Sequence, residues 1–312
     1  MKFLLLLFFL TSVGSVTAAQ RPGWKPSVGH SQIQIWSGKP PDAVAVAGPE
    51  VVATEAKSLV AGKPWVYVGQ VSSPTITVYS PTVHNTGAAV VVFPGGGYWI
   101  LAIDLEGTEV CDWLTSRGIT CVLLKYRVPG ENKFPRSGAY PKSPVALEDA
   151  QRTIGLVRLH AAEWHIDPNK IGVLGFSAGG HLVAAISTNF AKRLYPAVDD
   201  ADKQSCRPDF AVAIYPGHMM ENTTKHFQLN PYVPVTKRTP PTFILQAEDD
   251  PIDDVQNSLV YYWALKKADV PVEMHLYAHG GHAFGLRRTQ FPITAWPALV
   301  EAWLGNIAMI PQ

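Results

Sequence analysis

The sequence predicts an α/β fold with a mostly parallel central sheet and helices on both faces. Short apolar segments that fit strands alternate along the chain with segments of helical periodicity. The central strand segments are nearly continuous runs of Val, Ile and Leu, which is typical of parallel strands covered on both faces. Hydrophobic residues make up 47% of the 312 residues, which is enough to bury a sizeable core and excludes wholesale disorder.

Predicted strands begin at residue 65 and recur through the rest of the chain. Short turns join the first of them, so the sheet could begin with antiparallel strands. Strands are expected at residues 65–68, 75–79, 88–93, 120–126, 170–176, 210–215, 242–246 and 272–277.

Helices are predicted between these strands from apolar residues that recur every three or four positions. The apolar stripes are Leu147, Ala150, Ile154, Val157, Ala161 and Trp164; Val255, Leu259 and Tyr262; and Trp296, Leu299, Trp303 and Ile307. Residues 20–64 are punctuated by Pro and Gly and are predicted to form an irregular N-terminal extension. Since the alternation continues without a break, residues 20–312 are predicted to form a single domain.

The N-terminus has the pattern of a secretory signal peptide. Lys2 precedes an apolar run at residues 3–10, and small residues follow as far as Ala18 and Ala19. The apolar run is much shorter than the roughly 20 residues that span a bilayer, so cleavage is favoured over an uncleaved membrane anchor. Residues 1–19 are therefore predicted to be a signal peptide, and the mature chain to be secreted or periplasmic with no membrane association.

Charge and cysteine content narrow the function classes. Lys and Arg number 26 and Asp and Glu 25, which gives a net charge of +1 and no support for nucleic-acid binding. The chain has 3 cysteines, too few for a disulfide scaffold. Cys111 and Cys121 lie on a predicted helix and the strand after it, so they could pair, but buried free thiols are the favoured interpretation.

The segment after the strand at 170–176 predicts a nucleophilic serine. It reads Gly175-Phe176-Ser177-Ala178-Gly179, a Gly-x-Ser-x-Gly pattern between a strand and a helix. The turn at such a serine is sharp, and the positions two before and two after it must be small. Ser177 is therefore predicted to be a nucleophile, and the alternative is a glycine-rich turn with a capping serine.

A second glycine-rich loop is predicted to supply an oxyanion hole. The strand at 88–93 runs into Pro94-Gly95-Gly96-Gly97, and glycines let backbone N–H groups approach a developing oxyanion closely. The predicted donors are the amides of Gly96, Gly97 and Ala178. A phosphate-binding loop is the alternative, but neither Gly-x-Gly-x-x-Gly nor Gly-Lys-Ser/Thr is present.

The acid and the base are sought at the ends of the last strands, because the carboxyl ends of parallel strands meet at one edge of the sheet. His282 is predicted to be the general base and Asp250 the carboxylate that orients it. His279 is the rival base. Of the competing carboxylates, Asp253 and Asp254 are expected to cap a helix and Asp249 to be a solvated neighbour.

Other polar and aromatic residues are predicted to bind substrate or to make structural contacts. Tyr98 and Trp99 follow the glycine loop and are predicted to bind substrate, together with the long connections at 129–143 and 217–239, which could equally pack over the sheet. Asp104 and Glu106 are expected to be helix-cap and dipole partners, and Arg127 and Asp149 could pair. The spacing of His275, His279 and His282 could suggest a metal, but no further ligand cluster supports one, so neither a metal nor another cofactor is predicted.

With these motifs in place, the chain resembles the secreted bifunctional feruloyl and acetyl xylan esterases, near the hormone-sensitive-lipase-like branch of the α/β-hydrolases. The resemblance covers roughly residues 32–308, although Pro94 stands where a His often precedes the three glycines. Its carriers are Ile35-Trp36, residues 73–79, 94–98 and 124–127, Gly175-Phe176-Ser177-Ala178-Gly179-Gly180-His181 and Gly280-Gly281-His282-Ala283-Phe284-Gly285.

The resemblance implies an α/β-hydrolase fold and a serine carboxylesterase that hydrolyses acetyl or feruloyl esters of a small molecule or of plant polysaccharide such as xylan. A serine peptidase of the prolyl-oligopeptidase type would use the same residues, but such enzymes usually add a propeller. A non-catalytic binding protein on the same fold is the third alternative. Such proteins typically lose one of the three residues Ser177, Asp250 and His282. The oligomeric state stays open.

Overall fold

The computed structural model describes residues 23–43, 46, 48–82, 84–128, 145–220 and 227–312. The predicted signal peptide at residues 1–19 and the predicted connection at 129–143 lie outside the described residues. The division of the chain into a signal peptide and one domain stays a prediction.

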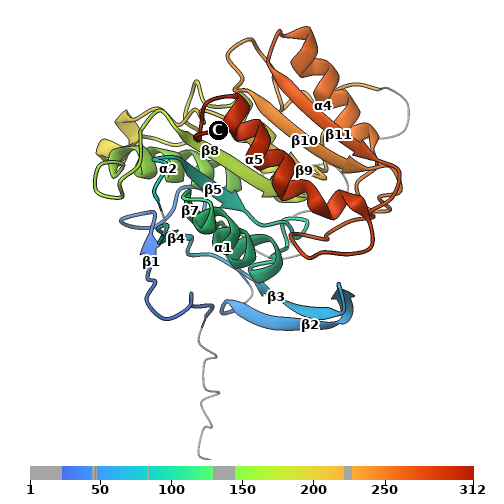
Figure 1. Cartoon of the computed structure of the whole chain (residues 1–312). Coiled ribbons are helices and arrows are strands. Elements are labelled where there is room, and N and C mark those ends of the chain that lie inside the picture. The colour runs from blue at the N-terminus through green and yellow to red at the C-terminus, as the bar shows by residue number, and fades with distance from the viewer. Residues whose placement is uncertain (1–22, 44–45, 47, 83, 129–144, 221–226) are drawn as a thin grey trace, which may run out of the picture.

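The centre of the molecule is an eight-stranded sheet in the order β1-β4-β7-β5-β8-β9-β10-β11 (Figure 1). Its strands are β1 Gln32–Gln34, β4 Thr75–Tyr79, β5 Ala89–Phe93, β7 Thr120–Lys125, β8 Ile171–Phe176, β9 Ala211–Ile214, β10 Thr242–Ala247 and β11 Val272–Tyr277. The strands from β7 to β11 in this order are parallel, while β1 and β4 add an antiparallel edge. The predicted fold class is confirmed, and the sheet does begin with antiparallel strands. These are β1 and β4, whereas the predicted first strand at 65–68 lies in another sheet.

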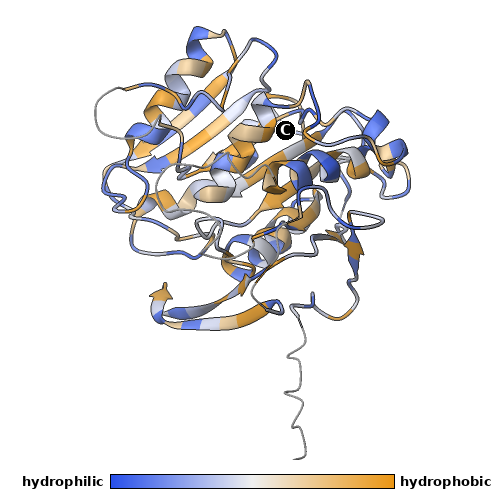
Figure 2. Cartoon of the chain, turned by 180° about the vertical axis from the view of Figure 1, so that it is seen from behind, coloured by the Kyte–Doolittle hydropathy of each residue, from blue (hydrophilic) through white to orange (hydrophobic). Residues whose placement is uncertain are grey.

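Helices cover both faces of this sheet, as Figure 1 and the reverse view in Figure 2 show. On one face α1 and α5 meet, and the rings of Trp113 and Trp296 lie 5.5 Å apart there. On the other face α2 packs against α3, and α3 shares an apolar cluster with α4. The bounds are α1 Glu109–Ser116, α2 Val145–Leu159, α3 Ala178–Thr188, α4 Gln256–Lys267 and α5 Trp296–Asn306. No helix among these described residues is long and apolar enough to cross a bilayer.

The N-terminal region is more ordered than the sequence suggested. The prediction of an irregular extension at 20–64 is wrong, because β1 and β2 (Val51–Val60) lie within it. The predicted strand at 65–68 is β3 (Lys63–Gly69), which pairs with β2 and β6 (Ile100–Leu101) in a separate three-stranded sheet. Most of β2 faces solvent, so its sequence carries no clean alternation of apolar and polar residues that would have marked it as a strand.

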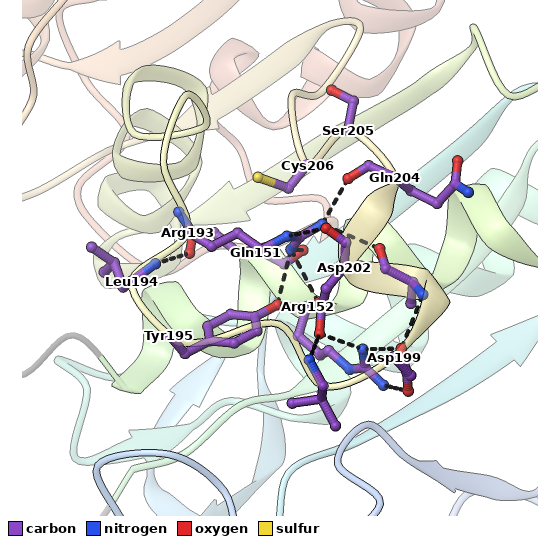
Figure 3. A network of polar contacts seen from close by, with 12 residues as sticks. Gln151, Arg152, Arg193, Leu194, Tyr195, Asp199, Asp202, Gln204, Ser205 and Cys206 are labelled. Carbon is purple, nitrogen blue, oxygen red and sulfur yellow. Dashed lines mark hydrogen bonds and ion pairs between the residues drawn. The ribbon is translucent and has the colours of Figure 1, made fainter.

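Buried ion pairs fasten α2 to its surroundings. Asp149 accepts hydrogen bonds from the Arg127 side chain at 2.9 and 3.0 Å and from the Trp36 indole at 2.8 Å, so the predicted Arg127–Asp149 pair is confirmed. One turn further along, Arg152 pairs with Asp199 and Asp202 in the network drawn in Figure 3. The two guanidinium groups thereby tie this helix to segments far away in the sequence.

Cys111 on α1 and Cys121 on β7 form a disulfide, whereas Cys206 is a buried free thiol. The preference for free thiols at the first two positions is therefore wrong. Only the short turn at 117–119 separates α1 from β7, which brings the two residues to neighbouring positions in the core. Buried cysteines satisfy the hydrophobic pattern equally well with or without a bond, so the pattern could not distinguish the two states.

Replacing both Cys111 and Cys121 with Ala should lower the free energy of unfolding by about 3 kcal/mol, as the loss of loop-closure entropy predicts for residues 10 apart. Thermal and denaturant unfolding with and without a thiol reductant would measure the change. The wild-type protein should lose stability in the reductant while the double variant does not respond. Equal stability of both proteins under non-reducing conditions would contradict the assignment.

Candidate active site

Ser177 occupies the sharp turn between β8 and α3. Its backbone lies at φ 51° and ψ −116°, a region that residues with a side chain rarely adopt. A Cβ atom on Gly179 would lie 2.0 Å from the Phe93 carbonyl oxygen, and one on Gly175 would lie 2.3 Å from the Gly179 carbonyl oxygen. These close contacts with carbonyl oxygens explain why both positions are glycine, in line with the predicted need for small residues.

His282 and Asp250 come together at the ends of neighbouring segments. The Nδ1 atom of His282 lies 2.7 Å from Oδ2 of Asp250, which leaves Nε2 toward the cavity that holds Ser177. Asp250 is itself fixed, because its oxygens accept hydrogen bonds from the Gln246 amide at 3.0 Å and from the backbone N–H groups of Ile252 and Asp253. The two residues singled out as base and orienting acid are therefore adjacent and held in one orientation.

The rival pair lies outside the cavity. The His279 ring contacts Asp249 at 3.2 Å, and the His279 side chain is 71% exposed. Asp249 also accepts hydrogen bonds from the backbone N–H groups of Gly280 and Gly281, so it braces the loop that carries His282. Asp249 was expected to be only a solvated neighbour, but these hydrogen bonds give it a structural role in this turn.

Asp253 is not the helix cap that the sequence suggested. The Ser177 hydroxyl donates a hydrogen bond to Oδ2 of Asp253 at 3.0 Å, and Nε2 of His282 lies 3.7 Å from the same oxygen. Asp254 does play a capping part, because it accepts the backbone N–H of Gln256 at 2.8 Å. The local Asp-Asp pattern could not tell which carboxylate turns inward, since that depends on the cavity formed by distant segments.

The glycine loop after β5 lies in the wall of the same cavity. Gly96 has φ 128° and Gly97 has φ 61°, and a Cβ on Gly96 would lie 2.3 Å from the Ile100 carbonyl oxygen. Ala178 is buried directly after Ser177, at the first position of α3. The three predicted amide donors therefore come from two backbone segments next to Ser177.

Glu106 is a site residue that sequence reasoning missed. It is not a cap: its carboxylate accepts the backbone N–H of Gly95 at 2.8 Å and the Tyr215 hydroxyl at 2.8 Å, and it lines the cavity. Tyr215 also accepts the backbone N–H of Gly285, and its ring lies 4.9 Å from that of His282. Burial raises the pKa of Glu106, and it outweighs the hydrogen bond from Tyr215, which lowers the pKa. Glu106 and Tyr215 thus connect the glycine loop to the His282 loop.

Tyr98 and Trp99, the two aromatic residues after the glycine loop, lie in different surroundings. Trp99 lines the cavity, and its role in substrate binding stays a prediction. The Tyr98 side chain is buried, and its hydroxyl lies 2.8 Å from Nδ1 of His181, so the structure does not bring Tyr98 to the cavity. From the predicted connection at 217–239, His218 lines the cavity, while Met219 and Val233 pack in the core against α4.

The cavity has a volume of about 420 Å³ and two kinds of wall. Apolar side chains form most of it, and ionisable groups gather beside Ser177. Its lining residues are Trp65, Gly96, Gly97, Trp99, Ile100, Ala102, Leu105, Glu106, Ser177, His218, Ile252, Asp253, His282 and Ala283. Such a site would enclose a small apolar group next to the serine hydroxyl.

His275, His279 and His282 each face a different carboxylate. Glu273 lies 2.8 Å from His275, whereas the other two contact Asp249 and Asp250. Within the described ranges, no group of His, Cys, Asp and Glu residues is arranged to hold a metal ion.

Comparison with known proteins adds three findings. A family model described as alpha/beta hydrolase fold matches residues 90–286. An acetylxylan esterase of Xylanibacter ruminicola is 31% identical over 224 residues, 65% of this chain and 42% of that protein. Endo-1,4-beta-xylanase B of Butyrivibrio fibrisolvens is 27% identical over 67% of this chain and 35% of its own length. The chain therefore spans less than half of these two relatives.

A solved structure covers far more of the chain. The acetyl ester-xyloside bifunctional hydrolase from Caldicellulosiruptor lactoaceticus superimposes with a TM-score of 0.67 and 32% identity, over 90% of this chain and 97% of that one. An esterase from Thermogutta terrifontis, at 22% identity and a TM-score of 0.61, shows the same fold.

The surroundings of His282 predict the pH dependence of any reaction in which it acts as a base. Burial lowers the pKa of His282, but the hydrogen bond with Asp250 and the charges of Asp253, Asp250 and Glu106 outweigh it and raise the pKa above 6.5. A base must be unprotonated, so kcat/KM for a neutral ester should fall as the pH drops through a value above 6.5. An acid limb centred below 6.5, with the protein folded by circular dichroism, would contradict this.

Replacing Glu106 with Leu should lower kcat by about 10- to 100-fold, because the Gly95 amide loses its acceptor and the loop loses its position. Glu106→Gln keeps one acceptor oxygen and should lose less. Steady-state kinetics with a neutral acetyl ester, together with melting temperatures, would test both variants. An unchanged kcat in Glu106→Leu would show that Glu106 does not position the glycine loop.

Proposed function

This chain belongs to the alpha/beta hydrolase fold family, and on that premise we propose that it is a serine carboxylic-ester hydrolase that works through an acyl-enzyme. The resemblance to acetyl xylan esterase-like members, expected from the motifs, is confirmed. One observation carries the proposed activity: Ser177, on a strained turn, shares a cavity with His282, whose Nδ1 side is held by Asp250. Nucleophile, base and orienting acid are the parts that acyl transfer requires.

In the first half of the proposed reaction, His282 takes the proton of the Ser177 hydroxyl while Oγ bonds to the ester carbonyl carbon. For this step the hydroxyl turns from Asp253 toward Nε2 of His282, and both atoms lie within 3.7 Å of the same carboxylate oxygen. The bond from the carbonyl carbon to the alcohol oxygen then breaks. His282 returns the proton to that oxygen, so the alcohol leaves and the acyl group stays on Ser177.

Backbone amides stabilise the charge that develops on the carbonyl oxygen. The amides of Gly96, Gly97 and Ala178 are the proposed donors, and the N-terminal end of α3 adds its partial positive charge. In the second half, His282 removes a proton from water, the hydroxide bonds to the acyl carbon, and Ser177 leaves with the proton from His282. The acid is released and no cofactor is consumed.

The proposed substrates are short acetyl or feruloyl esters of plant polysaccharide such as xylan. Support comes from the names of the relatives and from the apolar walls of a cavity of about 420 Å³, formed in part by Trp65 and Trp99. Hydrolysis of acetylated xylan, methyl ferulate and p-nitrophenyl esters of increasing acyl length would test the substrate class. We also propose export to the periplasm or the medium, on the pattern of residues 1–19.

Ser177→Ala should reduce ester hydrolysis by about 10⁴-fold or more without loss of the fold, because Ser177 carries the only hydroxyl among the described residues that line the cavity. The measurement is release of acid from p-nitrophenyl acetate and from acetylated xylan, with circular dichroism as the control for folding. Substantial turnover by a folded Ser177→Ala protein would leave the mechanism without a nucleophile.

Two neighbouring His–Asp pairs provide matched controls for the base. His282→Ala and Asp250→Asn should each lower kcat by several orders of magnitude, since one removes the base and the other its orienting charge. His279→Ala and Asp249→Asn alter a similar contact in solvent and should lower kcat far less. The opposite ranking would transfer the role to the exposed pair.

A further inference from the structure

The proposed reaction assigns no role to Asp253, a buried carboxylate that contacts Ser177 and lies near His282. Asp253 is held in place, since its backbone N–H bonds to Asp250 and its carbonyl accepts the Gln246 amide at 2.9 Å. A Cβ on Gly217 would lie 2.3 Å from Oδ1 of Asp253, so the glycine leaves room for this carboxylate. The Asp253 side chain is only 13% exposed and lines the cavity.

Acylation removes the hydrogen-bond donor that faces Asp253. In the free protein, Oδ2 accepts the hydroxyl proton of Ser177 at 3.0 Å. In an acyl-enzyme this serine oxygen is an ester oxygen and carries no proton. A buried carboxylate that loses its donor is costly, so the reaction is favoured when another donor reaches Oδ2.

The alcohol half of the substrate is well placed to supply that donor. Its ester oxygen must receive a proton from Nε2 of His282, and Nε2 lies 3.7 Å from Oδ2 of Asp253. The alcohol half therefore lies beside Asp253 when its bond to the acyl group breaks. A hydroxyl on the carbon next to the ester can then reach the carboxylate, whereas a simple alkyl chain offers no donor.

The charged groups around Asp253 are compatible with this role. His282, His218 and Ser177 face it, Asp250 precedes it on the same loop, and Glu106 lines the same cavity. Trp65, Trp99 and Ile252 belong to the apolar part of the wall. The ionisable groups of the cavity are thus gathered around Asp253, beside Ser177 and His282.

We propose that Asp253 is a specificity-determining residue that accepts a hydrogen bond from a free hydroxyl of the alcohol half, so that esters of sugars and other polyols are preferred over esters of simple alcohols. The inference rests on the proposed function and narrows its substrate class to esters with a neighbouring hydroxyl. A hydrogen bond to a charged acceptor predicts a preference of about 10- to 100-fold in kcat/KM.

The first test uses the wild-type chain and two esters of matched size. Hydrolysis of 2,3-dihydroxypropyl acetate and of propyl acetate is followed by release of acetic acid at constant pH. We expect kcat/KM to be about 10- to 100-fold higher for the dihydroxy ester. Equal values for the two esters would overturn the proposal without any need for a variant to fold.

The second test asks whether Asp253 causes the preference. The ratio of kcat/KM values for the two esters should approach one in Asp253→Leu and fall partway in Asp253→Asn. It should stay at the wild-type value in Asp254→Asn, which changes the adjacent carboxylate that bonds Gln256. If Asp253→Leu lowers hydrolysis of both esters by the same factor, Asp253 only orients Ser177 and the proposal is wrong.

Failure of this inference can be distinguished from failure of the proposed function. Ser177→Ala must abolish hydrolysis of both acetates if the serine mechanism is right, whatever their ratio in the wild-type protein. An active wild-type enzyme that shows no preference keeps the esterase and removes the assignment of Asp253. Hydrolysis that survives in Ser177→Ala removes both.

Discussion

The turn that carries Ser177 depends on direct backbone contact between two strand ends. The Gly179 backbone lies against the Phe93 carbonyl oxygen, where β5 ends and the glycine loop begins. A Cβ on Gly95 would lie 2.7 Å from the Phe176 carbonyl oxygen, so the loop also lies against the end of β8. Serine and loop are therefore positioned by one packed contact, and a side chain at either glycine would move both. The remaining site residues are arranged around this fixed pair.

Carboxylates dominate the electrostatics around that pair. Asp250 contacts one nitrogen of His282, Asp253 lies near the other, and Glu106 lies in the same cavity. Burial raises the pKa of both Glu106 and Asp253, so the site resists holding all of its negative charge. The same charges stabilise the imidazolium form of His282, which is the form that the proposed mechanism requires after the serine proton is taken. In the proposed mechanism, the arrangement thus favours the charged intermediate while requiring a higher pH to deprotonate His282.

Sequence patterns predicted the features that depend on residues close together in the chain. Continuous Val, Ile and Leu runs marked the central strands, and the glycines around Ser177 marked the turn because sterics demand them there. The sequence analysis missed that Glu106 and Asp253 point into the cavity. The partners of Glu106 are Gly95 and Tyr215, and Tyr215 follows β9, more than a hundred residues away in the chain. The disulfide between Cys111 and Cys121 was missed for a different reason, because burial looks the same for bonded and free cysteines.

The small N-terminal sheet connects the part of the fold that was predicted least well to the cavity. Its strand β3 supplies Trp65 to the cavity wall. Arg287, five residues after His282, donates hydrogen bonds to the carbonyl oxygens of Lys63 and Pro64 at 3.0 and 2.9 Å and pairs with Glu109. The start of β3 and the His282 loop are thereby held by one guanidinium group. A sheet separate from the eight-stranded one thus shares its anchoring with the His282 loop, which links the position of Trp65 in the apolar wall to that of His282.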